Sequence, residues 1–99
     1  MKRLDSIEEF ESIINGSKVI VIFYNYFHAS MFVKDTYIKQ LIDKHSDVDF
    51  LGVNVDDYPE IVDKYDIKLI PSVVRFENGY MVNNISVFAS VEELEEFIK

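Results

Sequence analysis

The sequence predicts a single α/β domain over residues 1–99, built on a central sheet that contains both parallel and antiparallel strands. An unbroken run of six β-branched or aromatic residues at 19–24 is typical of a strand that is buried on both faces. Stretches with helical periodicity alternate with other apolar runs, an order that produces parallel strands joined by helices. Later in the chain, Asn78-Gly79 separates two apolar segments and predicts a β-hairpin, because both residues accept a positive φ.

The first elements are a short edge strand, which we expect to begin at Leu4, and a helix that ends at Asn15-Gly16. The helix begins in the pattern Ser6-Ile7-Glu8-Glu9. This pattern predicts a capping box, in which the side chains of Ser6 and Glu9 each accept a hydrogen bond from the other residue's backbone N–H. Helical spacing predicts one buried face, formed by Ile7, Phe10, Ile13 and Ile14.

The run at 19–24 is expected to be the central strand, and it leads directly into the junction Asn25-Tyr26-Phe27-His28-Ala29-Ser30-Met31-Phe32-Val33. Turn residues between a strand and a helix are normally polar, whereas this junction carries aromatic side chains, a histidine and a methionine. Open α/β sheets place their ligand sites at the carboxyl ends of such strands. We therefore expect this junction to be the functional end of the domain.

A second helix is predicted to follow the junction, with Ser30 as its N-cap and Lys44 near its end. The next apolar run, at 48–55, predicts a strand that is parallel to the central one, because a helix connects the two. Pro59 stands in the first turn of a third helix, where its missing N–H costs no hydrogen bond.

The last third of the chain predicts a strand at 72–76, an antiparallel strand at 81–87 and a final helix. Ser90-Val91-Glu92-Glu93 is a second capping-box pattern at the start of that helix. Its buried stripe is expected to consist of Val91, Leu94, Phe97 and Ile98. We expect the carboxylates of this helix to form a solvated face that consists of Glu92, Glu93, Glu95 and Glu96.

Composition excludes several classes of function. The chain has no cysteine, which excludes disulfides, thiolate metal sites and thiol chemistry. Its formal net charge of -8 repels the phosphate backbone of nucleic acids, so we expect no direct nucleic-acid partner. No apolar run approaches the roughly 18 residues of a membrane span, and the first residues lack the apolar core of a signal peptide. We expect an acidic, cytoplasmic protein that needs no cofactor and does not bind membranes.

The stretch Leu69-Ile70-Pro71-Ser72-Val73-Val74-Arg75-Phe76-Glu77-Asn78-Gly79 resembles the thioredoxin family, in which Ile-Pro-Thr precedes an apolar strand and a Phe-x-Asn-Gly hairpin. Val53-Asn54-Val55-Asp56 is similar to the family's third strand, and the resemblance covers essentially the whole chain. It implies a thioredoxin fold, with a mixed sheet in the strand order 1-3-2-4-5 flanked by four helices. It also implies a cis Ile70–Pro71 bond, with the backbone beside Pro71 facing the junction.

The resemblance identifies the reactive groups that this chain lacks. When the family's Trp-Cys-Gly-Pro-Cys motif is laid on the junction, Phe27 falls on the Trp and His28 on the nucleophilic Cys. Ala29 and Ser30 fall on the Gly and the Pro, and Met31 falls on the resolving Cys. Both sulfur atoms of the motif are therefore replaced.

Three supporting positions differ from the family as well. The family's buried, proton-relaying Asp falls on Ile22, and its neighbouring Lys falls on Gly52. The Gly that keeps the family's substrate groove open falls near Phe88. The chain therefore resembles a thioredoxin scaffold from which the redox chemistry has been removed.

We interpret the chain as a redox-inactive, thioredoxin-like protein that is not an enzyme and that binds another protein or an extended peptide. Family members hold extended peptides by backbone pairing next to the cis-proline, and this mode of binding needs no thiol. The expected binding surface consists of Tyr26, Phe27, His28, Ala29, Ser30, Met31, Phe32, Ile70, Pro71 and Phe88.

Other interpretations of the junction remain open. His28 and Ser30 are candidate groups of a non-redox enzyme, although an N-cap role explains Ser30 and a helix N-terminus disfavours a charged His28. A metal held by both His28 and His45 is excluded within one chain, because a helix of about 15 residues separates them by roughly 20 Å. Alternatively, the aromatic side chains pack on Phe88 and close the groove, or a structural dimer buries them. We expect a monomer or a weak homodimer.

Overall fold

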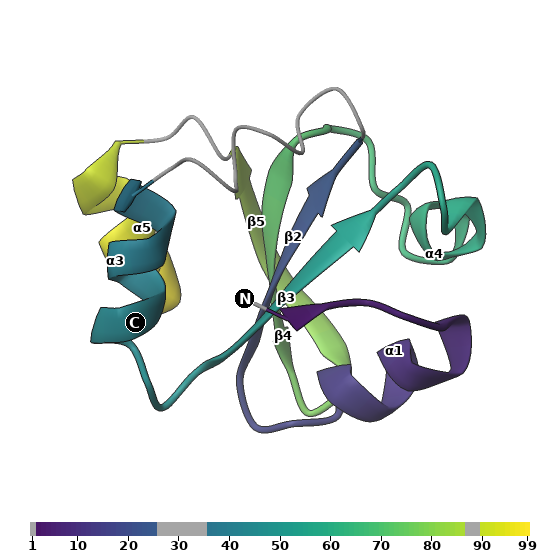
Figure 1. Cartoon of the computed structure of the whole chain (residues 1–99), viewed down its shortest axis with the longest axis horizontal. Helices are drawn as coiled ribbons and strands as arrows, with labels where there is room; N and C mark the ends of the chain where they lie inside the picture. The colour runs from purple at the N-terminus through teal and green to yellow at the C-terminus, as the bar shows by residue number, and fades with distance from the viewer. Residues whose placement is uncertain (1, 26–35, 87–89) are drawn as a thin grey trace.

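The computed structural model describes residues 2–25, 36–86 and 90–99. Within these ranges, five strands form one mixed sheet in the order β1-β3-β2-β4-β5, which confirms the predicted order (Figure 1). The first three run parallel to one another, and β4 and β5 are antiparallel to their neighbours. The strands are β1 (Lys2–Arg3), β2 (Val19–Tyr24), β3 (Asp49–Asn54), β4 (Ser72–Glu77) and β5 (Tyr80–Ser86).

The helices of the described ranges cover both faces of the sheet. Figure 1 shows α1 (Ile7–Ile14) and α4 (Pro59–Lys64) on one side, and α3 (Thr36–Lys44) and α5 (Val91–Ile98) on the other. Helix α3 ends at Lys44, as predicted, whereas the predicted start at Ser30 lies outside the described residues. None of the helices in the described ranges is long and apolar enough to cross a membrane.

Strand β2 is buried along its whole length, which confirms the prediction from its unbroken apolar run. Its side chains alternate between two cores, as the period of a strand requires. Val19, Val21 and Phe23 belong to the core under α1 and α4. The intervening residues of β2 pack with Leu41 of α3 and with Leu94, Phe97 and Ile98 of α5. A polar residue on either face of β2 would therefore enter a core.

The start of the chain differs from the prediction in two details. Strand β1 ends before Leu4, whose N–H closes the ladder by donating to the Gly52 carbonyl at 2.9 Å while its side chain turns into the core. The predicted capping box at Ser6 and Glu9 forms only in half. The Ser6 hydroxyl accepts a hydrogen bond from the Glu9 N–H, but the Glu9 carboxylate pairs with Lys2. The box was predicted from local spacing alone, and β1 places a competing cation beside the carboxylate.

The hairpin at Asn78 and Gly79 is confirmed, with φ values of 53° and 89°. The turn also contacts the end of α1. The Gly79 N–H donates to the Ile14 carbonyl at 2.8 Å, and the Asn78 N–H donates to the Gly16 carbonyl at 2.9 Å. At the other end of the domain, the capping box of Ser90 and Glu93 is complete, as predicted.

Candidate functional site

The predicted site lies where β2 ends, and the structure describes its border. Tyr26, Phe27, His28, Ala29, Ser30, Met31, Phe32 and Phe88 lie outside the described residues. The predicted roles of the aromatic junction and the alternative enzyme centred on His28 and Ser30 therefore remain predictions. Ile70 and Pro71 are described, together with the segment that precedes them.

The register of the sheet brings Pro71 to the end of β2. Strands β2 and β4 are antiparallel, and Phe23 is the partner of Ser72, so Pro71 lies beside the last residue of β2. The Ile70–Pro71 peptide bond is cis, and both Pro71 and Ser72 are buried. Ile70 is half-buried against the core under α1 and α4. The two described residues of the predicted surface thus lie at the carboxyl end of β2, where the sequence predicts the functional site.

Leu69 is a candidate site residue that the sequence pattern does not single out. It stands two positions before Pro71, and 67% of its accessible surface is exposed. In the sequence, its apolar side chain belongs to a segment that leads into β4. One sequence feature does indicate its exposure. Leu69 lies between Lys68 and Ile70 in a connection, and an apolar residue in a connection does not pack as part of a strand. Next to a predicted binding loop, such a residue is a candidate contact.

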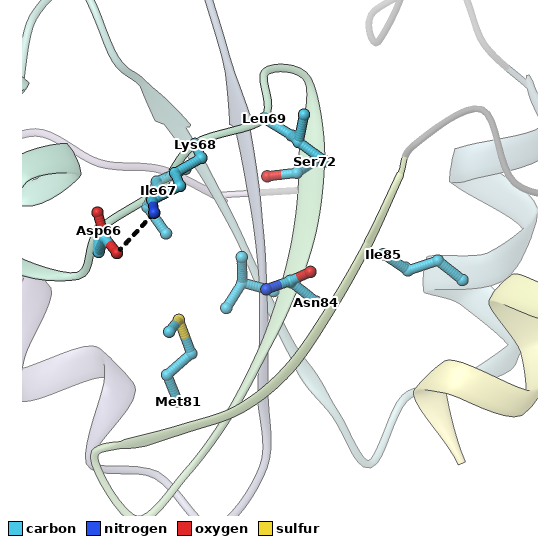
Figure 2. Close-up of a pocket in the computed structure, with 9 residues that line it drawn as sticks. Asp66, Ile67, Lys68, Leu69, Ser72, Met81, Asn84 and Ile85 are labelled. Atoms are coloured by element: carbon cyan, nitrogen blue, oxygen red, sulfur yellow. Dashed lines mark ion pairs between the residues drawn. The ribbon is translucent and has the colours of Figure 1, made fainter.

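A cavity of about 330 Å³ lies beside Leu69, between the connection from α4 to β4 and the edge strand β5 (Figure 2). Its polar groups include Ser72 and Asn84, and an ion pair between Lys68 and Asp66, at 3.6 Å, borders it. The apolar lining includes Ile67, Leu69, Val74, Met81 and Ile85. Apolar walls with a few polar groups are the mixture that characterises ligand pockets.

The two positions of the family's proton relay carry no ionisable group. Ile22 is 2% exposed and packs in the core under α3 and α5. Gly52 is its partner in the parallel register of β2 and β3. These positions therefore contribute packing and backbone pairing, and no proton transfer.

Glu95 forms a polar cluster with His45 and Lys44, which corrects the prediction that it belongs to a solvated face. Its carboxylate lies 2.8 Å from His45 Nε2 and accepts a hydrogen bond from Lys44 Nζ at 3.2 Å. The side chain is 18% exposed. The hydrogen bond with His45 first, and the one with Lys44 second, lower the pKa of Glu95 below its usual value. The spacing of glutamates on α5 gave no sign of these partners on α3.

This polar cluster lies at the opposite end of the sheet from Pro71. Asp49 comes shortly after His45 in the chain, and its register partner is Val19, the first residue of β2. The cluster joins the end of α3 to α5, so its role in the described structure is to hold two helices together. Among the described residues, no group of three His, Asp or Glu side chains is arranged to hold a metal ion.

Comparisons with known proteins agree on one family. The sequence profile described as Thioredoxin matches residues 3–99. Thioredoxin of Mycoplasmoides gallisepticum is 28% identical over 100 residues, which covers 100% of both chains. Thioredoxin of Mycoplasma genitalium is 35% identical over 75 residues, which covers 75% of this chain and 74% of that protein. The solved structure of Plasmodium falciparum thioredoxin matches with a TM-score of 0.84 and 26% identity, and it covers 99% of this chain and 96% of that one.

Proposed function

This chain belongs to the thioredoxin family and has its fold, and we propose that it is a redox-inactive member that binds an extended segment of another protein. The proposed surface combines the junction from Tyr26 to Phe32, the loop at Ile70-Pro71 and Phe88. Leu69 is added to it because of its exposure. The proposal has two parts, the loss of thiol chemistry and the retention of a binding surface.

The loss of thiol chemistry is supported by the composition and by the two buried positions. Thiol–disulfide exchange needs a thiolate that attacks a disulfide sulfur, and the chain has no cysteine. Histidine at position 28 and methionine at position 31 form no mixed disulfide. The replacement of the proton-relay positions by Ile22 and Gly52 points in the same direction.

The retention of a binding surface is supported by the exposure of Leu69, the single observation that carries this part. Leu69 is 67% exposed, and it lines the same cavity as Met81, another exposed apolar residue, so the two are grouped at one site next to Pro71 and are not scattered singly. Main-chain groups next to Pro71 lie at the end of β2, where an extended segment is able to pair with them. Such pairing depends on backbone groups and is independent of the lost sulfur atoms.

The binding part is tested with a library of random, extended peptides selected on the immobilised protein. Enriched peptides are then measured against Leu69→Asp, which removes the apolar contact, and against Ile7→Asp as the matched control. Ile7 is also an exposed apolar residue, but it lies on α1 and does not line the cavity. We expect binding to weaken at least about tenfold for Leu69→Asp and to change little for Ile7→Asp. Peptides that bind all three proteins equally would refute the proposed surface.

The redox part is tested separately, by turnover of a disulfide substrate such as insulin with a reductant. We expect the rate with this protein to equal the buffer control. Turnover above that control would refute the loss of thiol chemistry without affecting the binding test. Thioredoxin of Mycoplasmoides gallisepticum, as a relative that covers the full length of the chain, serves as the comparison protein.

A further inference from the structure

The outer edge of β5 is open to strand pairing. In the described part of the chain, β5 pairs with β4 alone and stands at the end of the sheet order. Proteins usually protect such an edge with lysine or other charges, with proline, with a β-bulge, or by making the strand very short. Strand β5 has seven residues, Tyr80-Met81-Val82-Asn83-Asn84-Ile85-Ser86, without a charge or a proline. Its register against β4 shifts once, between Arg75 and Phe76, so Val82 has no partner on β4 and the regular pairing resumes at Asn83. Because 28% of the chain is charged, this edge departs from the rest of the sequence.

Two different surfaces flank this edge. On one side of β5, Met81 and Asn84 point into the cavity that Leu69 borders (Figure 2). They share this side although they are three positions apart, because the register shift lies between them. On the other side, the Ile85 side chain extends toward α3 and α5, although Ile85 also borders the cavity (Figure 2). A strand added to β5 would therefore direct alternate side chains toward one surface and then the other.

The surface on the α5 side is an open, acidic groove of about 510 Å³. Its apolar residues are Ile85 of β5 and Phe97 of α5, and its carboxylates are those of Glu92, Glu93 and Glu96. All three glutamates are exposed. A basic side chain that lies along the apolar residues and reaches these carboxylates fits this groove, because long cationic side chains pack their stems on apolar surface.

The cations around this groove neutralise only part of its negative charge, since one of them pairs with a groove carboxylate and the other pairs with Glu77. The Arg75 guanidinium, on the strand next to β5, lies 2.6 Å from Glu77 and also donates to the Phe97 carbonyl. Lys99 Nζ lies 3.3 Å from Glu96, one of the three carboxylates. On the opposite surface, Lys68 and Asp66 form their own pair, so Leu69 and Met81 present mainly apolar contacts there. One side of an added strand would thus meet negative charge and the other side apolar groups.

We propose that the outer edge of β5 binds an extended segment of a partner protein as a sixth strand, with side chains that alternate between basic and apolar. Its basic side chains face Glu92, Glu93 and Glu96, and its apolar ones face Met81 and Leu69. Charge opposes a second copy as the occupant, because each chain carries -8 and pairing of two β5 strands brings like-charged surfaces together. This edge is distinct from the surface around Pro71, although Leu69 borders both.

The test uses two synthetic peptides of about seven residues, a usual strand length, that contain the same lysines and valines. In one the two residues alternate, and in the other the lysines form a single block. Affinity is measured by fluorescence anisotropy at moderate salt, and hydrogen exchange of the β5 amides is followed with and without peptide. We expect the alternating peptide to bind at least about tenfold more tightly than its isomer and to protect β5 amides from exchange.

Two variants locate the binding. Glu92→Lys/Glu96→Lys should weaken binding of the alternating peptide at least about tenfold, because the groove loses its charge complementarity. The matched control, Glu8→Lys/Asp63→Lys, makes the same change in net charge at exposed positions on α1 and α4 and should leave the affinity nearly unchanged. Val82→Lys, at a residue that is 53% exposed on β5, should also weaken binding without lowering the melting temperature.

Four results would overturn the proposal. Equal affinity for the two peptides would show charge attraction without strand pairing, and binding without protection of β5 would place the peptide elsewhere. Sedimentation equilibrium that shows a dimer whose formation protects β5 would assign the edge to a second copy. If the control variant Glu8→Lys/Asp63→Lys lost as much affinity as Glu92→Lys/Glu96→Lys, the loss would depend on net charge and not on the groove.

Discussion

Ile22 of β2 and Gly52 of β3 are partners in a parallel register, and both are buried. By resemblance to the family, these are the positions of the proton-relaying Asp and its neighbouring Lys. The pairing explains why both differ here, because a lysine left at 52 beside an apolar residue would be a buried charge without its partner. An isoleucine and a glycine leave neither charge nor unpaired polar side chain at this pair of positions.

Restoring the two sulfur atoms should therefore give only a poor reductase. For His28→Cys/Met31→Cys we expect insulin reduction on the order of 10²-fold slower than for Mycoplasmoides gallisepticum thioredoxin, because no acid or base stands at position 22. Adding Ile22→Asp should raise the rate and lower the melting temperature, since it places a carboxyl group in the core under α3 and α5. Rates of the double variant equal to those of the comparison protein would contradict the importance of the buried acid.

The aromatic junction should contribute to binding more than to stability. In the sequence, Phe32 is out of phase at helical spacing with the apolar positions Ile38, Leu41 and Ile42. We therefore expect Phe32→Ala to change the free energy of unfolding by less than about 1 kcal/mol. The same change should weaken binding of the peptides selected on this protein by about 2 kcal/mol or more. Tyr26→Ala should behave alike. A loss of about 3 to 5 kcal/mol of stability in either variant would instead indicate a side chain packed in a closed groove.

The cluster of Glu95 and His45 should make stability depend on pH in the acidic range. The pKa of Glu95 in the folded protein is below its usual value of 4.5, so the folded state holds its proton less tightly than the unfolded state. The stabilisation is therefore complete above about pH 4.5 and is lost as the pH falls through the folded-state pKa. Glu95→Gln should lower the melting temperature near pH 7, and its difference from the unchanged protein should shrink at strongly acidic pH.

A control for this measurement is Glu92→Gln, which removes an exposed carboxylate from the same helix without removing the contact with His45. We expect a smaller change in melting temperature for this variant. If Glu95→Gln lowered the melting temperature by the same amount at neutral and at strongly acidic pH, packing and not ionisation of Glu95 would be responsible.

At position 79, the second position of the hairpin turn, glycine should be the only residue that causes no loss of stability. Gly79 has a φ of 89°, and an added Cβ would collide with the Asn15 side chain. We expect Gly79→Ala to lower the free energy of unfolding by about 1 to 3 kcal/mol, measured by urea denaturation. The double variant Asn15→Ala/Gly79→Ala should recover only part of this loss, because the collision is removed and the backbone strain stays. Full recovery would assign the whole effect to the collision.

The sequence by itself determined the elements and their order. The apolar run at 19–24 required a strand buried on both faces, since no polar residue in it was available for a solvated side. Asn78-Gly79 required a turn with positive φ at both positions, and the capping pattern at Ser90 located the start of α5. These signals are local, because each depends on the conformation of a few neighbouring residues.

Only the tertiary structure decided which distant side chains meet. Glu95 and His45 are 50 positions apart, and the packing of α3 beside α5 brings them together. The Glu9 carboxylate forms an ion pair with Lys2 instead of the predicted capping hydrogen bond, because β1 lies beside α1. Leu69 is exposed at a cavity because the connection before Pro71 runs opposite β5. Such contacts depend on how helices and strands pack against each other, a geometry set by the whole core that no short stretch of sequence encodes.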